Sequence, residues 1–97
     1  MFVGTLRVDV LLGDVHSLKQ KRALVRPIVT ELRKFDVAVA ETDHQDLHRR
    51  VEIGVACVSG DAAQVRRVLD TCERVVAERP DIEVLSVRQR LFDEEDE

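Results

Sequence analysis

Aromatic side chains are scarce in this sequence of 97 residues, which contains three phenylalanines, no tyrosine and no tryptophan. The core of a globular fold must therefore be aliphatic, built from the abundant Val, Leu, Ala and Ile. The same shortage argues against base stacking on a sheet, because that mode of RNA recognition needs aromatic side chains on the strands. We expect any contact with a nucleic acid to be made to its phosphates instead.

Motifs of several enzyme and metal-site classes are also missing. The two cysteines, Cys57 and Cys72, show no CxxC spacing, which argues against a zinc or redox site. Each lies in an apolar run, and we interpret both as buried, reduced thiols. The chain has no glycine-rich phosphate loop, nucleophile elbow or paired-carboxylate motif. No catalytic residue, cofactor or small-molecule substrate is indicated.

The hydrophobic runs are too short to span a bilayer, and the N-terminus has no basic segment followed by a cleavage site. We therefore expect a cytoplasmic protein with no membrane partner.

The net charge of −4 is unevenly distributed along the chain. Five of the 19 acidic residues form the C-terminal segment Asp93–Glu97, which leaves 15 basic and 14 acidic residues in the rest of the chain. Residues 16–34 hold six basic residues and one acidic residue. We interpret residues 1–92 as a single domain and residues 93–97 as a solvated acidic tail. A tail that shields the basic region is the alternative.

Hydrophobic periodicity predicts four strands and two helices. The strands are expected at residues 3–12, 37–42, 51–58 and 82–91, and the helices begin at Ser17 and near Asp61. The resulting order, β-α-β-β-α-β, is typical of the ferredoxin-like α+β sandwich. That fold has a four-stranded antiparallel sheet of order 4-1-3-2 with two helices on one face.

The first helix carries a start signal and an irregularity. Ser17 and Gln20 have the spacing of a capping box, in which each side chain accepts a hydrogen bond from the other residue's backbone N–H. Pro27 falls inside the helix, where it removes one backbone hydrogen bond. We expect a kink at Pro27, and a break near Arg26 is the alternative.

Two dense polar segments, residues 16–22 and 41–50, contain all three histidines of the chain. In the predicted topology they leave the same edge of the sheet and meet around the N-terminus of the first helix. We predict a site for RNA phosphates there. Its binding residues are His16, Ser17, Lys19, Lys21, Arg22, His44, Arg49 and Arg50, and it is shaped by Asp43, Gln45 and Asp46.

Cations at a helix start oppose the helix dipole, and a bound phosphate would remove that conflict. The alternative is a solvated basic helix face partnered by Asp43 and Asp46. A metal-dependent enzyme is a further alternative, because His44 and His48 have helical spacing and Asp43 could form an acid–base pair with His44. No third metal ligand is fixed by the spacing, however, and Ser17 is better explained as a helix cap than as a nucleophile.

The outer face of the sheet suggests a protein-interaction module. Small and apolar side chains are expected to gather there, and bare sheet faces often pack against a second subunit. These residues are Ala38, Ala40, Gly54, Ala56 and Val58. A homodimer formed through this face is therefore an alternative, or an addition, to RNA binding.

Three stretches of the chain resemble the YlxP-like bacterial family, a domain of unknown function. They are the segments at residues 16–22, 39–47 and 51–56. The resemblance implies a ferredoxin-like fold. It also implies a setting in translation or ribosome maturation, because genes of the family often neighbour those of translation initiation and ribosome-maturation factors. Pro27 and the acidic tail depart from the usual pattern. We therefore expect a small RNA- or ribonucleoprotein-binding domain.

Overall fold

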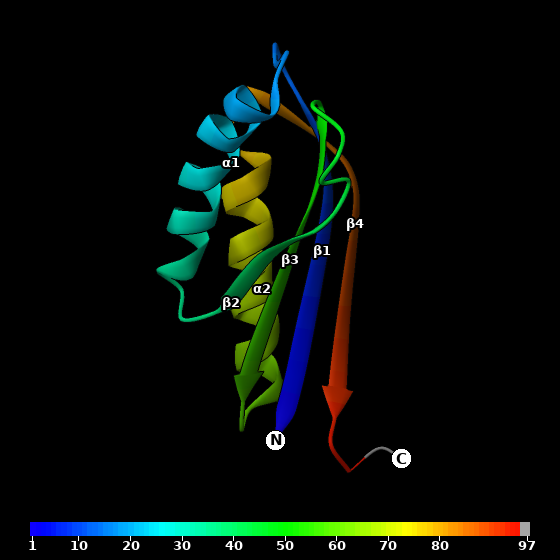
Figure 1. Cartoon of the computed structure of the whole chain (residues 1–97). Coiled ribbons are helices and arrows are strands. Elements are labelled where there is room, and N and C mark those ends of the chain that lie inside the picture. Colours follow the sequence, from blue (N-terminus) through cyan, green and yellow to red (C-terminus); the bar gives the residue numbers. More distant parts are fainter. Residues whose placement is uncertain (96–97) are drawn as a thin grey trace.

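The structure is a computed structural model that describes residues 1–95. Its elements are β1 (Phe2–Leu12), α1 (Leu18–Arg33), β2 (Ala38–Asp43), β3 (Arg50–Ser59), α2 (Ala62–Ala77) and β4 (Ile82–Asp93) (Figure 1). The predicted order of strands and helices is confirmed, with small shifts at the ends of the elements.

The four strands form one antiparallel sheet in the order β2-β3-β1-β4, which is the predicted order read from the other edge. Both helices cover the same face of this sheet and leave the other face open (Figure 1). The fold is therefore a ferredoxin-like α+β sandwich, as the sequence pattern predicts. No helix among residues 1–95 is long and apolar enough to cross a membrane.

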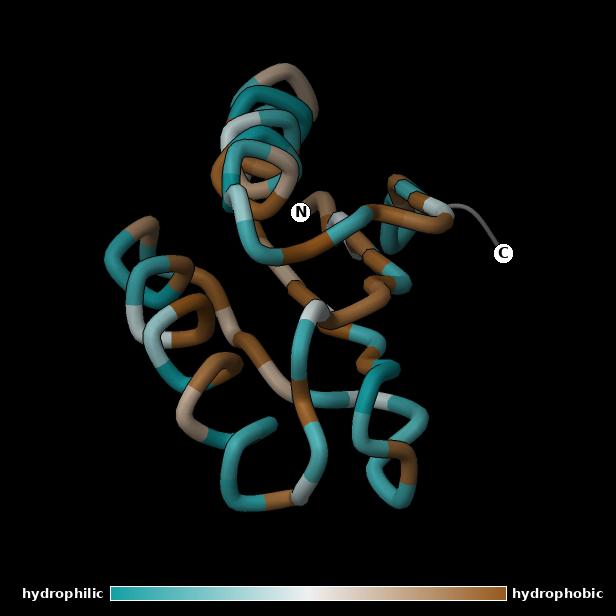
Figure 2. The backbone as a smooth tube through the Cα atoms, turned by 90° about the horizontal axis from the view of Figure 1, so that it is seen from above, coloured by the Kyte–Doolittle hydropathy of each residue, from teal (hydrophilic) through white to brown (hydrophobic). Residues whose placement is uncertain are grey.

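The core lies between the helices and the sheet. The even-numbered residues from Leu6 to Leu12 on β1 are completely buried, whereas Arg7 between them is exposed. Figure 2 colours the backbone by hydropathy in a view from above, with hydrophobic residues in brown and hydrophilic residues in teal. Cys57 and Cys72 are free and buried, as predicted. Burial, with a smaller contribution from the neighbouring Cys57, raises the pKa of the Cys72 thiol to about 11, so this thiol is neutral at physiological pH.

Helix α1 continues through Pro27, so the alternative of a break near Arg26 is wrong. Pro27 leaves the carbonyl of Ala23 without its helical N–H partner, and both residues are exposed, so that carbonyl faces solvent. Ser17 is the N-cap, and its Oγ accepts a hydrogen bond from the Gln20 N–H at 3.1 Å. The Gln20 side chain accepts instead from the His16 N–H, at 2.7 Å, one residue before the predicted donor.

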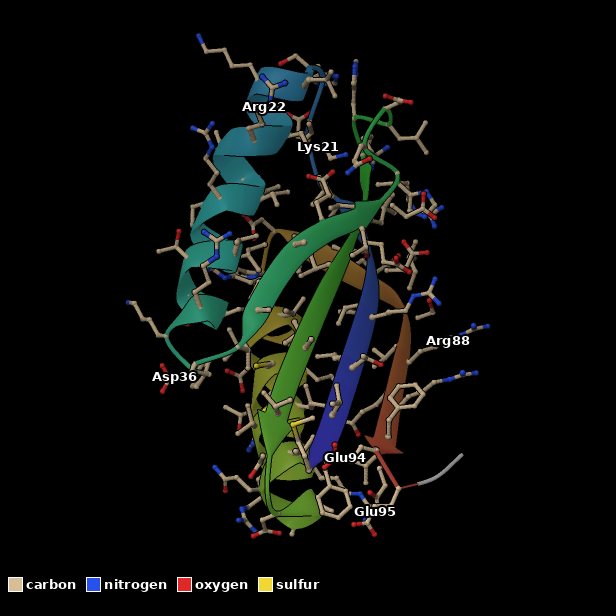
Figure 3. The ribbon with its side chains drawn as sticks, turned by 60° about the horizontal axis from the view of Figure 1, so that its bottom comes forward. Lys21, Arg22, Asp36, Arg88, Glu94 and Glu95 are labelled. Atoms are coloured by element: carbon tan, nitrogen blue, oxygen red, sulfur yellow. The ribbon has the colours of Figure 1, made fainter. Side chains whose placement is uncertain are left out.

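The predicted acidic tail begins inside β4, which includes Asp93. The next residue, Glu94, lies 3.0 Å from the N-terminal amino group. Figure 3 shows Glu94 and Glu95 at the end of the molecule opposite Lys21 and Arg22, so these carboxylates do not shield the start of α1. The last two residues of the predicted tail, 96–97, lie outside the described residues.

Gly4 on β1 lies at a close approach of the sheet to α2. A Cβ atom added at this position would lie 2.2 Å from Cγ1 of Val65 and 2.6 Å from Cδ1 of Leu69. We expect Gly4→Ala to lower the free energy of unfolding by about 1–3 kcal/mol, because the helix must move to relieve the overlap. Urea unfolding monitored by circular dichroism measures the change.

Gly60→Ala is the matched control, since a Cβ added at Gly60 meets no atom within 4 Å. That variant should unfold within about 1 kcal/mol of the parent protein. Equal stability of the Gly4 and Gly60 variants would contradict the packing of α2 directly on the backbone of β1.

Candidate functional site

The two polar segments lie at the same end of the molecule, as predicted. The Nζ atom of Lys21 in α1 donates hydrogen bonds to the carbonyl oxygens of His44 and Leu47, both at 2.8 Å. From the other segment, Nε of Arg49 donates to the carbonyls of Leu12 at 3.3 Å and Gly13 at 3.2 Å. These contacts connect the start of α1, the end of β1 and the connection between β2 and β3. Together the three segments form the polar end of the molecule.

Lys21 is a buried structural residue. Its side chain is 3% exposed, and Nζ also lies 3.0 Å from Oε1 of Glu41. The three donors of the ammonium group therefore meet three acceptors. The predicted phosphate contact of Lys21 is not possible in this arrangement, because no donor is left and the group is shielded from solvent. The buried stripe of α1, which is Lys21, Val25, Ile28 and Leu32, explains the burial.

The connection between β2 and β3 is held by its own polar groups. His44 adopts a left-handed backbone conformation with φ of 64°. Its N–H donates to Oδ1 of Asp43 at 2.7 Å, and its carbonyl accepts from the Leu47 N–H at 3.1 Å. Gln45 donates through Nε2 to the carbonyl of Glu41 at 3.2 Å. Asp43 and Gln45 therefore shape this connection, whereas Asp46 makes no side-chain hydrogen bond or ion pair within residues 1–95.

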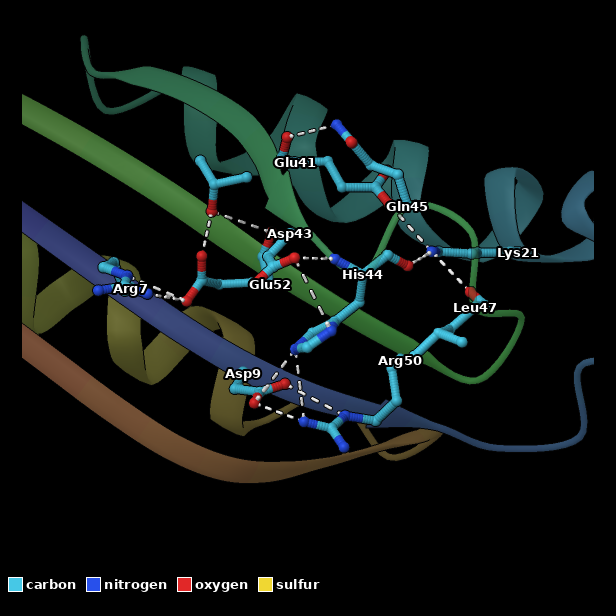
Figure 4. Close-up of polar contacts among 11 residues, drawn as sticks. Arg7, Asp9, Lys21, Glu41, Asp43, His44, Gln45, Leu47, Arg50 and Glu52 are labelled. Atoms are coloured by element: carbon cyan, nitrogen blue, oxygen red, sulfur yellow. Dashed lines mark hydrogen bonds and ion pairs between the residues drawn. The ribbon is translucent and has the colours of Figure 1, made fainter.

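Arg50 and His44 lie on the open face of the sheet, away from α1. Arg50 binds Asp9 with both ends of its guanidinium group, through Nε at 3.3 Å and a terminal nitrogen at 2.6 Å (Figure 4). His44 Nε2 lies 3.5 Å from that guanidinium and 3.6 Å from the Asp9 carboxylate. The single rim expected from the sequence is therefore divided between two faces, and Asp9 compensates the charge of Arg50.

A second group of polar contacts on the open face was not predicted from the sequence. Oγ1 of Thr42 donates to Oε2 of Glu52 at 2.6 Å, and Arg7 lies 2.9 Å from the other carboxylate oxygen. The register between β2 and β3 shifts at Thr42, which lies over Gly54. A Cβ on Gly54 would come within 2.5 Å of Cγ2 of Thr42, so the glycine leaves the space that Thr42 occupies.

Lys19 and Arg22 are exposed cations, and their predicted contact with phosphates stays a prediction. Neither makes an ion pair or side-chain hydrogen bond with any of residues 1–95. His16 is also exposed, and its Nε2 lies 2.5 Å from Oδ1 of Asp14. The partners suggested by the alternative interpretation, Asp43 and Asp46, bind neither of the two cations.

Further along α1, Arg26 and Arg33 are exposed as well and have no acidic partner among the described residues. The sequence analysis did not assign them to the site, although their spacing from Arg22 places all three on one side of a helix. The one acidic residue of α1, Glu31, instead lies 2.6 Å from Arg79, which follows the end of α2.

No group of three or more His, Cys, Asp and Glu side chains within residues 1–95 has an arrangement suited to a metal ion. The pair of His44 and His48 thus has no third ligand in the part of the chain that is described. The two thiols are poor nucleophiles, because burial raises the pKa of Cys57 and of Cys72.

Comparisons with known proteins find similarity over most of the chain. The family model described as "Protein of unknown function (DUF503)" matches residues 3–89. The uncharacterized protein YlxP of Bacillus subtilis (strain 168) is 31% identical over 91 residues, which cover 93% of this chain and 99% of that protein.

Replacing Lys21 tests whether its ammonium holds the polar end together. We expect Lys21→Met to lower the free energy of unfolding by about 2–4 kcal/mol, because it removes the partner of Glu41, leaves the Leu47 carbonyl without a donor and leaves the His44 carbonyl with only the Leu47 N–H. Chemical denaturation gives the value. Lys19→Met is the control, and it should change stability by less than about 0.5 kcal/mol because Lys19 is exposed and forms no ion pair with the described residues. A similar small effect of both variants would show that the three contacts of Lys21 are not formed.

Proposed function

We propose that this chain, which belongs to the DUF503 family of proteins of unknown function, binds RNA or a ribonucleoprotein particle through phosphate groups. The observation that carries this proposal is the pair of exposed cations Lys19 and Arg22 near the start of α1, neither of which has an acidic partner among residues 1–95. The first turn of this helix contains no acidic residue. Two cations beside the positive end of a helix dipole oppose folding slightly, and an anion bound there would reverse the sign of that interaction.

Neighbouring residues support the same site. Arg49 uses Nε on two backbone carbonyls and is otherwise exposed, so its terminal nitrogens can still donate to a phosphate. His16 adds a polar contact beside them, and Ser17 fixes the start of the helix. In the proposal, Lys21, Asp43 and Gln45 act by holding the β2–β3 connection in place, and Arg50 and His44 contribute from the open face of the sheet.

The setting is part of the proposal. Resemblance to the YlxP-like family favours translation or ribosome maturation in the bacterial cytoplasm. The two free, buried thiols are compatible with a reducing compartment. Recognition would depend on RNA shape and phosphate positions more than on base stacking, because residues 16–22 and 41–50 contain no Phe, Tyr or Trp.

Binding to a structured ribosomal RNA fragment should weaken steeply between about 50 and 200 mM salt, because bound cations release counterions from the RNA. Fluorescence anisotropy measures the affinity at each salt concentration. Changing both Lys19 and Arg22 to Ala should reduce the slope of log K against log salt by about 2.

Arg66→Ala is the matched control for this measurement, since Arg66 is an exposed arginine of α2 that forms no ion pair with the described residues. Its slope should equal that of the parent protein. A parent affinity that does not depend on salt, or an equal slope after loss of Lys19 and Arg22, would count against RNA binding through this end.

A second candidate function is supported by the open face of the sheet. A groove of about 360 Å³ lies there, and its lining includes Ala38, Ala40, Gly54 and Ala56. On the same face, Val3 pairs with Val58 and with Phe92 in the neighbouring strands, and the last two are 62% and 47% exposed. One face thus carries both a hollow of small side chains and a protruding apolar row. A two-fold axis would let each copy's row cover the other copy's hollow, which favours a homodimer as the interaction.

Ala56→Arg should convert such a dimer to a monomer, because a charged side chain would fill the groove. Sedimentation velocity across a concentration series measures the change, and RNA affinity should remain as in the parent protein. A parent chain that stays monomeric at the highest attainable concentration would eliminate this candidate without affecting RNA binding.

A further inference from the structure

A groove of about 500 Å³ lies between α1 and the edge strand β2. Arg22, Arg26, Thr30 and Arg33 line it from the helix, and Glu41 lines it from the strand. The rest of its lining is Val25 and Val29. The groove therefore has an apolar floor with three guanidinium groups along one wall.

The charge of this groove is positive because its nearest acidic residues already have partners. Glu41 lies 3.0 Å from Nζ of the buried Lys21, so its carboxylate does not neutralise an arginine of the groove. Glu31, on the same helix as the arginines, pairs at 2.6 Å with Arg79, which follows the end of α2. No ion pair among residues 1–95 involves Arg22, Arg26 or Arg33. The three cations are thus available to an external anion.

The spacing of the arginines suits a linear polyanion better than a single small anion. With 3.6 residues per turn, Arg22, Arg26 and Arg33 lie within about 40° of one another around the helix axis. Along the axis, Arg26 is about 6 Å and Arg33 about 16 Å from Arg22. Each strand of duplex DNA carries one phosphate per about 3.4 Å of helix axis, so at that spacing the distance from Arg22 to Arg33 spans about five phosphates, and a more extended single strand would place fewer there.

We propose that the groove between α1 and β2 binds one phosphodiester strand of RNA, which enters at Arg22 and runs along the helix to Arg33. This inference rests on the proposed function and extends it from the polar end to the flank of α1. The arginines donate to phosphate oxygens at three points along the strand, and the Thr30 hydroxyl can donate to another. The valine floor contacts the sugars, so the groove recognises the strand without reading its sequence.

Helix stability alone accounts for one of these arginines. Arg33 lies in the last turn of α1, where a cation is favoured by the helix dipole. Arg22 and Arg26 gain nothing from the dipole, and neither has an acidic partner among the described residues. A bound strand explains the positions of both, and it uses Arg33 as well.

The test measures affinity for oligouridylates of about 4, 8 and 12 nucleotides by fluorescence anisotropy. In the parent protein, affinity should rise with length and level off once the strand covers the groove. Changing Arg26 and Arg33 together to Ala should weaken binding of the longer strands about tenfold and lower the salt slope by about 1.4, since each phosphate contact of a single strand contributes about 0.7. Arg26→Lys and Arg33→Lys together should keep the slope but lose part of the affinity, because lysine lacks the forked donors.

Two comparisons identify what occupies the groove. A hairpin duplex with the same number of phosphates distinguishes binding of a free strand from binding of one strand of a duplex. If the binding of either RNA is weakened by the Arg26 and Arg33 substitutions, the result supports RNA binding in the groove. Poly-glutamate of matched charge is the competitor that represents an acidic protein. If it binds as tightly as RNA and responds equally to those substitutions, the groove is not an RNA site.

The groove and the proposed function can fail separately. If the Arg26 and Arg33 double variant binds every length like the parent protein, while loss of Lys19 and Arg22 weakens binding, the groove inference is overturned and the polar end remains. If the parent protein binds no RNA in any arm, both are overturned. Urea unfolding of the double variant should match that of Arg66→Ala, which shows that an altered affinity does not come from unfolding.

Discussion

The ammonium group of Lys21 determines how the connection between β2 and β3 sits against α1. An isolated buried lysine is costly, and this one is stable only because three acceptors surround it at 2.8 to 3.0 Å. Two of those acceptors are backbone carbonyls of the connection, so the lysine fixes the path of the chain rather than a side chain alone. The position of Arg49 beside the end of β1 follows from that path. An apolar residue at position 21 would fill the space but could not bind the carbonyls.

This arrangement also decides which cations face solvent. Glu41 forms an ion pair with Lys21, Asp9 with Arg50, and Glu31 with Arg79. Each of these pairs removes one charge of each sign from the surface, and what remains on α1 is positive. The positive charge on the exposed side of α1 therefore does not come only from an excess of basic residues in the sequence. It results from the pairing of the nearby acids with side chains that belong to the structure, which leaves the flank of the helix with positive charge.

The fold was predictable from the sequence because its signals are periodic and local. Alternation along β1, the Ser17 cap and the order of the elements each depend on neighbouring residues. The site was only partly predictable. That the two segments meet follows from topology, but the burial of Lys21 depends on its place in the stripe with Val25, Ile28 and Leu32, and charge alone suggested an exposed residue. The pairing of Arg50 with Asp9 and of Thr42 with Glu52 depends on strand register and on the irregularity at Thr42, which periodicity does not encode.

Strand β2 links the two faces that the proposals use. Glu41 points to the helix side and pairs with Lys21 beside the groove, whereas the next residue, Thr42, crosses the open face to Glu52. Adjacent residues of one edge strand thus support two separate surfaces, one basic and one mostly apolar. Because these surfaces lie on opposite faces of the sheet, a phosphodiester strand along α1 and a second copy on the open face would not compete for space. The proposed RNA binding and the proposed self-association would therefore be compatible in one small domain, and the separate substitutions that test them can be combined in a single chain.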